Sequence, residues 1–276
     1  MRKKRLFTPG PTEVPDEVLL EMAHPIIHHR TDEFKNIAKE VFQNLKYVFQ
    51  TENDVFILAS SGTGAMEAAV VNLLSEGDKV CVISAGKFGE RFREISKSYN
   101  LEVIPVEVQW GKSVKAEEIE NLLKKNTGIK AVFATLCETS TGTHFDIEGY
   151  GKVVSQFEET VLVVDAISSL GAIPCYTDKW NIDIVITGSQ KALMLPPGLS
   201  FMSISKKETG KQNVDSHKKV NKILKQTDPI KRNVEKDLES EENSPMDPPE
   251  AYKGETVDGV EYDQMNVLLQ NFMMSM

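Results

Sequence analysis

Residues 55–65 read Val-Phe-Ile-Leu-Ala-Ser-Ser-Gly-Thr-Gly-Ala, an apolar run followed by a turn of small residues. The next stretch, Ala65 to Leu74, has the pattern of a helix. A strand, a turn and a helix in this order leave free backbone N–H groups and the positive end of the helix at the turn, where they favour a phosphate group. Glycine and serine also form ordinary turns and helix caps, so the turn alone supports both interpretations.

The same alternation of short β-branched runs and amphipathic stretches continues to residue 187. It predicts an α/β fold, a mostly parallel sheet with helices on both faces. Ligands of such sheets bind at the carboxyl ends of the strands, so the residues that follow each strand are the candidates for a site. The expected strands are 55–58, 80–83, 101–108, 131–134, 161–164 and 182–187, and the expected helices are 65–74, 88–99, 116–125 and 147–156.

Composition excludes several classes of protein. A chain of 276 residues that is 40% hydrophobic can bury one large core. Its net charge of −9 argues against general nucleic-acid binding, which needs a basic surface. No apolar run approaches the roughly 20 residues that span a bilayer, and no signal peptide is indicated. The scattered Cys81, Cys137 and Cys175 predict no disulfide framework and suit a reducing cytoplasm, and we expect no metal site.

The chain divides into three expected parts. Residues 1–14 form an N-terminal arm, residues 15–207 a large α/β domain, and residues 208–276 a polar tail with 9 Lys+Arg and 14 Asp+Glu. From Lys211 to Pro249 the tail has few large apolar residues, and such a composition cannot bury enough surface to order the chain. We therefore expect the tail to be disordered or partly helical.

Two ionisable residues follow neighbouring predicted strands. Asp165 comes directly after Val161–Val164, and a buried carboxylate is costly unless it is paired. Its partner is either a backbone N–H or the protonated ring nitrogen of a cofactor. Lys191 follows the next strand, and burial there would lower the pKa of the amine and make it nucleophilic towards aldehydes, although a single lysine after a strand is more commonly a surface residue.

Taken together, the phosphate turn, the acid and the amine match the needs of pyridoxal 5′-phosphate (PLP). This cofactor needs a phosphate cradle, an acid that keeps its ring nitrogen protonated, and a lysine that holds its aldehyde as a Schiff base. The sequence therefore predicts a PLP-binding large domain in which Lys191 is the Schiff-base lysine and Asp165 faces the ring nitrogen.

Seven motifs between Phe7 and Leu193 carry a resemblance to the class V aminotransferases of PLP fold-type I, in particular the serine–pyruvate/alanine–glyoxylate aminotransferase group. Ordered motifs of this number are a far stronger signal than a lone glycine pattern. They are Phe7-Thr8-Pro9-Gly10-Pro11-Thr12, His29-Arg30-Thr31-Asp32-Glu33-Phe34, Ser61-Gly62-Thr63-Gly64-Ala65-Met66-Glu67-Ala68, Gly86-Lys87-Phe88-Gly89-Glu90-Arg91, Glu138-Thr139-Ser140-Thr141-Gly142, Asp165-Ala166-Ile167-Ser168-Ser169-Leu170-Gly171 and Thr187-Gly188-Ser189-Gln190-Lys191-Ala192-Leu193.

The resemblance implies roles for individual residues, with Lys191 and Asp165 as the catalytic pair. Phe88 would stack on the pyridine face, although plain core packing is its alternative. Gly10 would belong to the arm that approaches the substrate, although Pro-Gly-Pro is also a common rigid turn. The implied cofactor-binding residues are Gly62, Thr63, Gly64 and Gln190 at the phosphate, Thr139 near the ring hydroxyl, and Phe88, Asp165 and Lys191.

The implied activity is transfer of an amino group from an alanine-type or serine-type amino acid to a 2-oxo acid of the glyoxylate or pyruvate type, by a homodimer. Cysteine desulfurase chemistry needs a mobile nucleophilic cysteine, and no cysteine follows Cys175. A truncated or diverged module that binds cofactor or a partner subunit without turnover, and another PLP reaction such as a lyase, remain open.

Two departures from the family pattern concern the substrate more than the cofactor. Leu136 stands where the family often has a histidine. After about Lys207 we find no sign of the small C-terminal domain, which in the family supplies an arginine for the substrate carboxylate, and Arg232 is the only arginine of the tail. The sequence therefore predicts that this domain is missing or replaced, which should weaken substrate binding more than cofactor binding.

Overall fold

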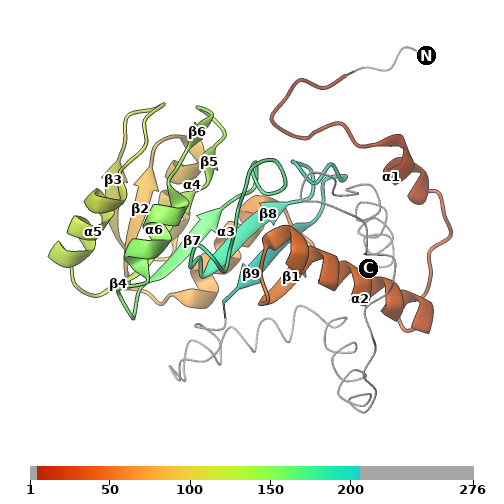
Figure 1. Ribbon diagram of the computed structural model, residues 1–276, viewed down its shortest axis with the longest axis horizontal. Helices are drawn as coiled ribbons and strands as arrows, with labels where there is room; N and C mark the ends of the chain where they lie inside the picture. The colour runs from red at the N-terminus through yellow and green to blue at the C-terminus, as the bar shows by residue number, and fades with distance from the viewer. Residues whose placement is uncertain (1–4, 206–276) are drawn as a thin grey trace.

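A central seven-stranded sheet organises the protein, with strands in the order β1-β9-β8-β7-β4-β2-β3 (Figure 1). The computed structural model describes residues 5–205, so the expectations for the tail and for the small C-terminal domain lie outside the described residues. The strands are β1 Asp54–Leu58, β2 Lys79–Ser84, β3 Glu102–Glu107, β4 Ile129–Thr135, β7 Val161–Asp165, β8 Ile184–Gly188 and β9 Ser200–Ile204.

Strand direction brings three carboxyl ends together. β9 runs antiparallel to both of its neighbours, β8 and β1, while the other neighbouring pairs of the sheet are parallel. Since β1 and β8 are both antiparallel to β9, they run in the same direction as each other and as β7. The carboxyl ends of these three strands therefore lie at the same edge of the sheet. The predicted mostly parallel sheet is confirmed, but the antiparallel β9 was not predicted. A separate hairpin pairs β5 (Cys137–Glu138) with β6 (Thr143–His144).

Helices cover both faces of the sheet, as predicted. Val80 and Val82 of β2 belong to an apolar core that includes α3 and α4, whereas Cys81 and Ile83 belong to the core on the opposite face with α2, α5 and α6. This alternation follows from the two-residue period of a strand. No helix within residues 5–205 is long and apolar enough to cross a membrane. The helices are α1 Asp16–Glu21, α2 Asp32–Phe49, α3 Gly62–Leu73, α4 Lys87–Ser98, α5 Ala116–Lys125 and α6 Ile147–Val154.

The helix α2 was not among the predicted elements, although the sequence carries its signals. Thr31 caps its N-terminus by accepting a hydrogen bond from the backbone N–H of Phe34 at 3.3 Å. Its buried residues recur at helical spacing and form one stripe that packs near β1: Phe34, Ala38, Val41, Leu45 and Phe49.

Candidate active site

The three sequence features that predicted a cofactor site lie at one edge of the sheet. The turn after β1 opens α3, Asp165 is the last residue of β7, and Lys191 follows the end of β8 at Gly188. Asp165 is paired with Ile186 of β8 in the sheet register. A Cβ atom on Gly62 would lie 2.5 Å from Cδ1 of Ile167, so the N-terminus of α3 touches the loop that follows Asp165. The structure thus brings the predicted residues together.

The Asp165 carboxyl group is almost fully enclosed, with 4% of its residue surface exposed. Its Oδ1 accepts a hydrogen bond from the backbone N–H of Ile167 at 2.8 Å. Burial raises the pKa of Asp165 to about 7, against the opposing effects of this hydrogen bond and of the charges of Arg91 and Lys191. Among the described residues, no basic side chain forms an ion pair with it. The backbone therefore satisfies one oxygen, and a positive ligand group could satisfy the other.

Lys191 is half-buried beside the N-terminal arm. Burial lowers the pKa of its amine below the ordinary value, while the charge of Asp165 opposes this shift. A lower pKa enlarges the neutral fraction that can attack an aldehyde. A Cβ atom on Gly10 would lie 2.5 Å from Nζ of Lys191, so the arm passes directly against the end of the Lys191 side chain.

Thr12 fixes the arm to the loop that carries Lys191. Its backbone N–H donates to the carbonyl oxygen of Gln190 at 3.0 Å, and its hydroxyl donates to the carbonyl oxygen of Lys191 at 2.7 Å. The predicted arm residue Gly10 therefore lies directly over the predicted cofactor lysine.

The predicted phosphate turn is joined to β9 by a hydrogen bond of 2.7 Å between the hydroxyls of Ser60 and Ser200, and its other contacts are longer. Ser61 accepts a long hydrogen bond of 3.4 Å from the backbone N–H of Gly64. Arg91 donates from Nη1 to the hydroxyl of Thr63 at 3.3 Å, which adds a positive charge beside the turn. Oε1 of Gln190 is a buried oxygen without a hydrogen-bond partner in the described part of the chain. Buried polar atoms are rarely left unpaired, so this amide points to a polar ligand group.

Phe88 and Thr139 border the same edge. Phe88 is half-buried rather than part of the core, and the guanidinium carbon of Arg91 lies 5.0 Å from the centre of its ring. The hydroxyl of Thr139 donates to the hydroxyl of Ser168 at 2.8 Å, which holds Thr139 against the loop after Asp165.

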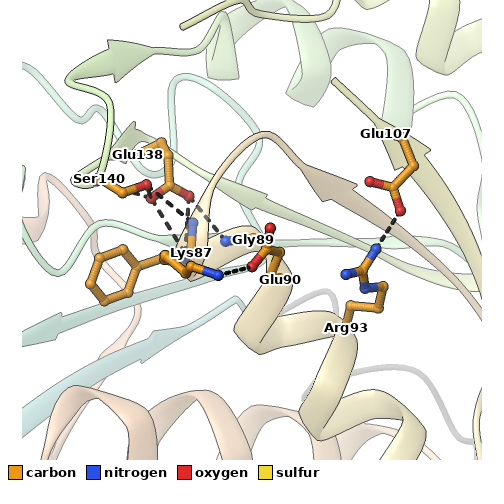
Figure 2. A network of polar contacts seen from close by, with 8 residues as sticks. Lys87, Gly89, Glu90, Arg93, Glu107, Glu138 and Ser140 are labelled. Carbon is orange, nitrogen blue, oxygen red and sulfur yellow. Dashed lines mark hydrogen bonds and ion pairs between the residues drawn. The ribbon is translucent and has the colours of Figure 1, made fainter. Parts of the chain in front are cut away.

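One buried group at this edge, Glu138, had no role assigned from the sequence. It is fully buried and accepts hydrogen bonds from the backbone N–H groups of Phe88 and Gly89, as the dashed lines of Figure 2 indicate. The sequence carried two signals for it: an acidic residue soon after an apolar strand, as with Asp165, and its place at the start of the motif Glu138-Thr139-Ser140-Thr141-Gly142.

The sequence profile described as Aminotransferase class-V matches residues 5–228. The chain belongs to the class-V aminotransferases. The resemblance seen in the motifs is therefore confirmed, and with it the expected PLP fold-type I architecture. Class-V aminotransferases of this type are PLP-dependent enzymes.

Several relatives are similar to this class-V aminotransferase over most of its length. An uncharacterized aminotransferase of Methanocaldococcus jannaschii is 46% identical over 215 residues, which are 77% of this chain and 56% of that protein. The serine–glyoxylate aminotransferase of Methylorubrum extorquens is 38% identical over 209 residues, 74% of this chain and 52% of that protein. The chain thus spans about half the length of the curated relatives it matches.

Solved structures of the same fold agree. The aspartate aminotransferase of Thermus thermophilus matches with a TM-score of 0.74 at 28% identity, over 99% of this chain and 70% of that chain. An alanine–glyoxylate aminotransferase from Nostoc sp. matches with a TM-score of 0.76 at 26% identity, over 99% of this chain and 68% of that chain.

Proposed function

We propose that the chain is the PLP-binding part of an aminotransferase that moves an amino group from a small amino acid of the alanine or serine type to a 2-oxo acid of the glyoxylate or pyruvate type. One observation carries the proposal: Asp165 ends β7 and Lys191 follows the adjacent strand β8, at the edge where α3 begins. The relatives named for serine–glyoxylate and alanine–glyoxylate transfer support the substrate class.

The residues at this edge fit PLP. The enclosed carboxyl group of Asp165, which has no basic partner among residues 5–205, suits a positively charged ring nitrogen. The amide of Gln190, whose Oε1 has no partner among residues 5–205, and the first N–H groups of α3 suit the phosphate, because an amide can turn its N–H end towards an anion. Thr139 and Phe88 would contact the ring.

Lys191 would hold the cofactor through Nζ, would be released as a free amine when the amine of the donor takes its place, and would then accept the proton that leaves the α-carbon of the donor. When bound, PLP supplies an electron sink for that proton loss. Asp165 would keep the ring nitrogen positively charged, and the low-polarity setting that raises its pKa strengthens this interaction. Gly10 would bring the arm next to Nζ without blocking it.

Spectroscopy on the full chain tests the proposal. After incubation with PLP and removal of the free cofactor by gel filtration, the wild-type protein should remain yellow, and alanine or serine should then bleach the colour. Lys191→Ala should lose the colour on gel filtration, whereas Lys152→Ala, which removes an exposed lysine that is paired with Glu148 on α6, should behave as the wild type.

The other outcomes of this experiment separate the alternatives. A wild-type chain that stays colourless with PLP would contradict the proposal as a whole. A yellow chain that no amino donor bleaches would instead be a cofactor-binding module without turnover. Product analysis decides between transfer and elimination: alanine plus glyoxylate should give glycine and pyruvate, whereas pyruvate formed from serine alone would mark a lyase.

We also propose that the chain forms a homodimer and works in a reducing cytoplasm. Large apolar side chains in the N-terminal segment and α1 face outwards, among them Phe7 at 94%, Leu20 at 66% and Ile26 at 68% exposure. Such a group of exposed apolar residues favours burial against a second copy. Sedimentation at micromolar concentration should give twice the chain mass, and Leu20→Lys should shift it towards the monomer.

Cys81, Cys137 and Cys175 are free thiols, which suits a reducing compartment.

A further inference from the structure

The helix α4 is capped by residues far along the chain and not by its own N-cap residue. That residue is Gly86, which has no side chain to offer. The N–H of Lys87 donates to the hydroxyl of Ser140 at 3.1 Å. The N–H groups of Phe88 and Gly89 each donate to Oε2 of Glu138 at 3.1 Å (Figure 2). The free N–H groups that open a helix are therefore satisfied here by β5 and the turn that follows it.

Glu138 is surrounded by donors. Besides the two N–H groups of α4, its Oε1 accepts from the backbone N–H of Ser140 at 3.2 Å and from the hydroxyl of Ser140 at 2.6 Å. Its negative charge lies at the positive end of the helix, which stabilises a charge that would otherwise be costly to bury. The three backbone N–H groups require an acceptor, so the NH₂ group of a glutamine at this position would face at least one N–H donor.

The first turn of α4 has no free space around it. A Cβ atom on Gly86 would lie 2.4 Å from the hydroxyl oxygen of Ser140 and 2.5 Å from Cγ of Glu138. A Cβ atom on Gly89 would lie 2.4 Å from the carbonyl oxygen of Ile83, at the end of β2. The turn is therefore clamped between the sheet on one side and Glu138 on the other.

Phe88 is the residue of this turn that is linked to the candidate site, through Arg91. Its N–H lies in the clamp, and its ring lies beneath the guanidinium of Arg91, which is itself hydrogen-bonded to Thr63 of the phosphate turn. The position of the ring is therefore fixed from the backbone side by Glu138 and from the other side by Arg91.

We propose that Glu138 is a positioning residue, whose carboxylate fixes the first turn of α4 so that the ring of Phe88 packs against the ring of the cofactor. This inference rests on the proposed function, because the position of Phe88 matters to a ligand only if PLP binds at this edge. A merely structural Glu138 would stabilise the fold without any coupling to Phe88.

The test measures binding of pyridoxamine 5′-phosphate, which carries an amine in place of the aldehyde and so cannot bond covalently to Lys191. Glu138→Gln, Phe88→Leu and the double variant are titrated as full chains. Each single variant should raise the Kd about 5-fold, the size of an aromatic packing interaction. The double variant should bind no more weakly than either single variant, because Glu138 acts through Phe88. Glu107→Gln, which removes the exposed carboxylate that pairs with Arg93 further along the same helix, should leave the Kd unchanged (Figure 2).

Ser140→Ala serves as a second variant should Glu138→Gln fail to fold. It removes one donor to Glu138 and the acceptor of the Lys87 N–H but keeps the carboxylate. It should raise the Kd about 2-fold in the wild-type background and not at all in the Phe88→Leu background.

Wild-type binding with an unaltered Kd in Glu138→Gln, or in Ser140→Ala where only that variant folds, would overturn the inference and leave the proposed function standing. The same holds if the effects of Glu138→Gln and Phe88→Leu multiply in the double variant. A wild-type chain that binds neither PLP nor pyridoxamine 5′-phosphate would instead overturn the proposed function, and this inference with it.

Discussion

The helices α3 and α4 both begin at the carboxyl edge of the sheet, and their N-termini are satisfied in different ways. The first N–H groups of α3 have one weak local acceptor, Ser61, at 3.4 Å. Those of α4 are taken by Glu138 and Ser140, which lie 49 to 53 residues further along the chain. Both ends have the positive polarity that attracts an anion, but of the two only α3 has N–H groups without an acceptor among residues 5–205. Whether a helix N-terminus can bind a phosphate is therefore decided by the protein oxygens that already accept its first N–H groups, and not by the helix dipole.

Removing the carboxylate that caps α4 should reduce the stability of the protein more than any other change considered below. Glu138→Ala leaves the N–H groups of Phe88 and Gly89 without an acceptor in a buried place, and it should lower the free energy of unfolding by about 3 kcal/mol or more. Denaturant unfolding of the cofactor-free protein measures this change. A loss below about 1 kcal/mol, the net value of one ordinary hydrogen bond, would show that α4 does not depend on its distant cap.

Asp165 differs from Glu138, the other buried carboxyl group at this edge, because within residues 5–205 it accepts one backbone hydrogen bond, from Ile167. Its pKa rises from 3.8 to about 7 on folding, so the native state binds a proton more tightly than the unfolded state does. Its contribution to stability is full below the unfolded pKa and is lost as the pH rises through the folded pKa. Between pH 5 and pH 8 the free energy of unfolding of the cofactor-free wild type should fall by about 2 to 3 kcal/mol more than that of Asp165→Asn.

Denaturant unfolding of both proteins at several pH values measures this difference, and the subtraction removes the titration of all other groups. Parallel stability curves for the wild type and Asp165→Asn across this range would contradict the raised pKa.

Paired glycine substitutions compare the two ends directly. Gly86→Ala places a methyl group against Glu138 and Ser140, which are both held by hydrogen bonds, and should cost about 1 to 3 kcal/mol of stability. Gly62→Ala meets the tip of the Ile167 side chain, which can rotate away, and should cost less than about 1 kcal/mol. Melting temperatures of the two variants provide the comparison. Equal losses would mean that both ends are equally crowded.

The smallest effect belongs to the local cap of α3. Ser61→Ala removes one long hydrogen bond and should cost about 0.5 to 1 kcal/mol, the usual value of an exposed N-cap. Added PLP should restore part of this loss, because a phosphate would take over the same N–H groups. Thermal unfolding with and without PLP measures both quantities, and an unchanged deficit in the presence of PLP would argue against a phosphate at this turn.

The parallel part of the sheet was predictable because its strands are short apolar runs separated by helices. The strand β9 was missed for two reasons. Its residues Ser200 and Ser203 are buried serines that interrupt the apolar pattern, and no helix separates it from β8. Strand direction is also set by pairing with distant neighbours, which a local pattern does not contain.

The site was predictable where an ionisable residue stands at or soon after the end of a strand, as Asp165 and Lys191 do. The structure brings these two residues together. Their catalytic roles stay predictions until the variants are measured. Glu138 shows the limit of this approach, because its meaning depends on Phe88 and Gly89, which precede it by 50 and 49 residues. The role of a residue whose partners are that distant in sequence does not follow from its neighbours in the chain.

The anchoring of Thr12 has a consequence for synthesis of the chain. Its partners at Gln190 and Lys191 are 178 and 179 residues away. A ribosome adding about 5 to 20 residues each second makes the arm many seconds before the loop that receives it. The arm must therefore wait, unattached, until β8 and the following loop have folded, and its docking completes this edge of the sheet late in folding.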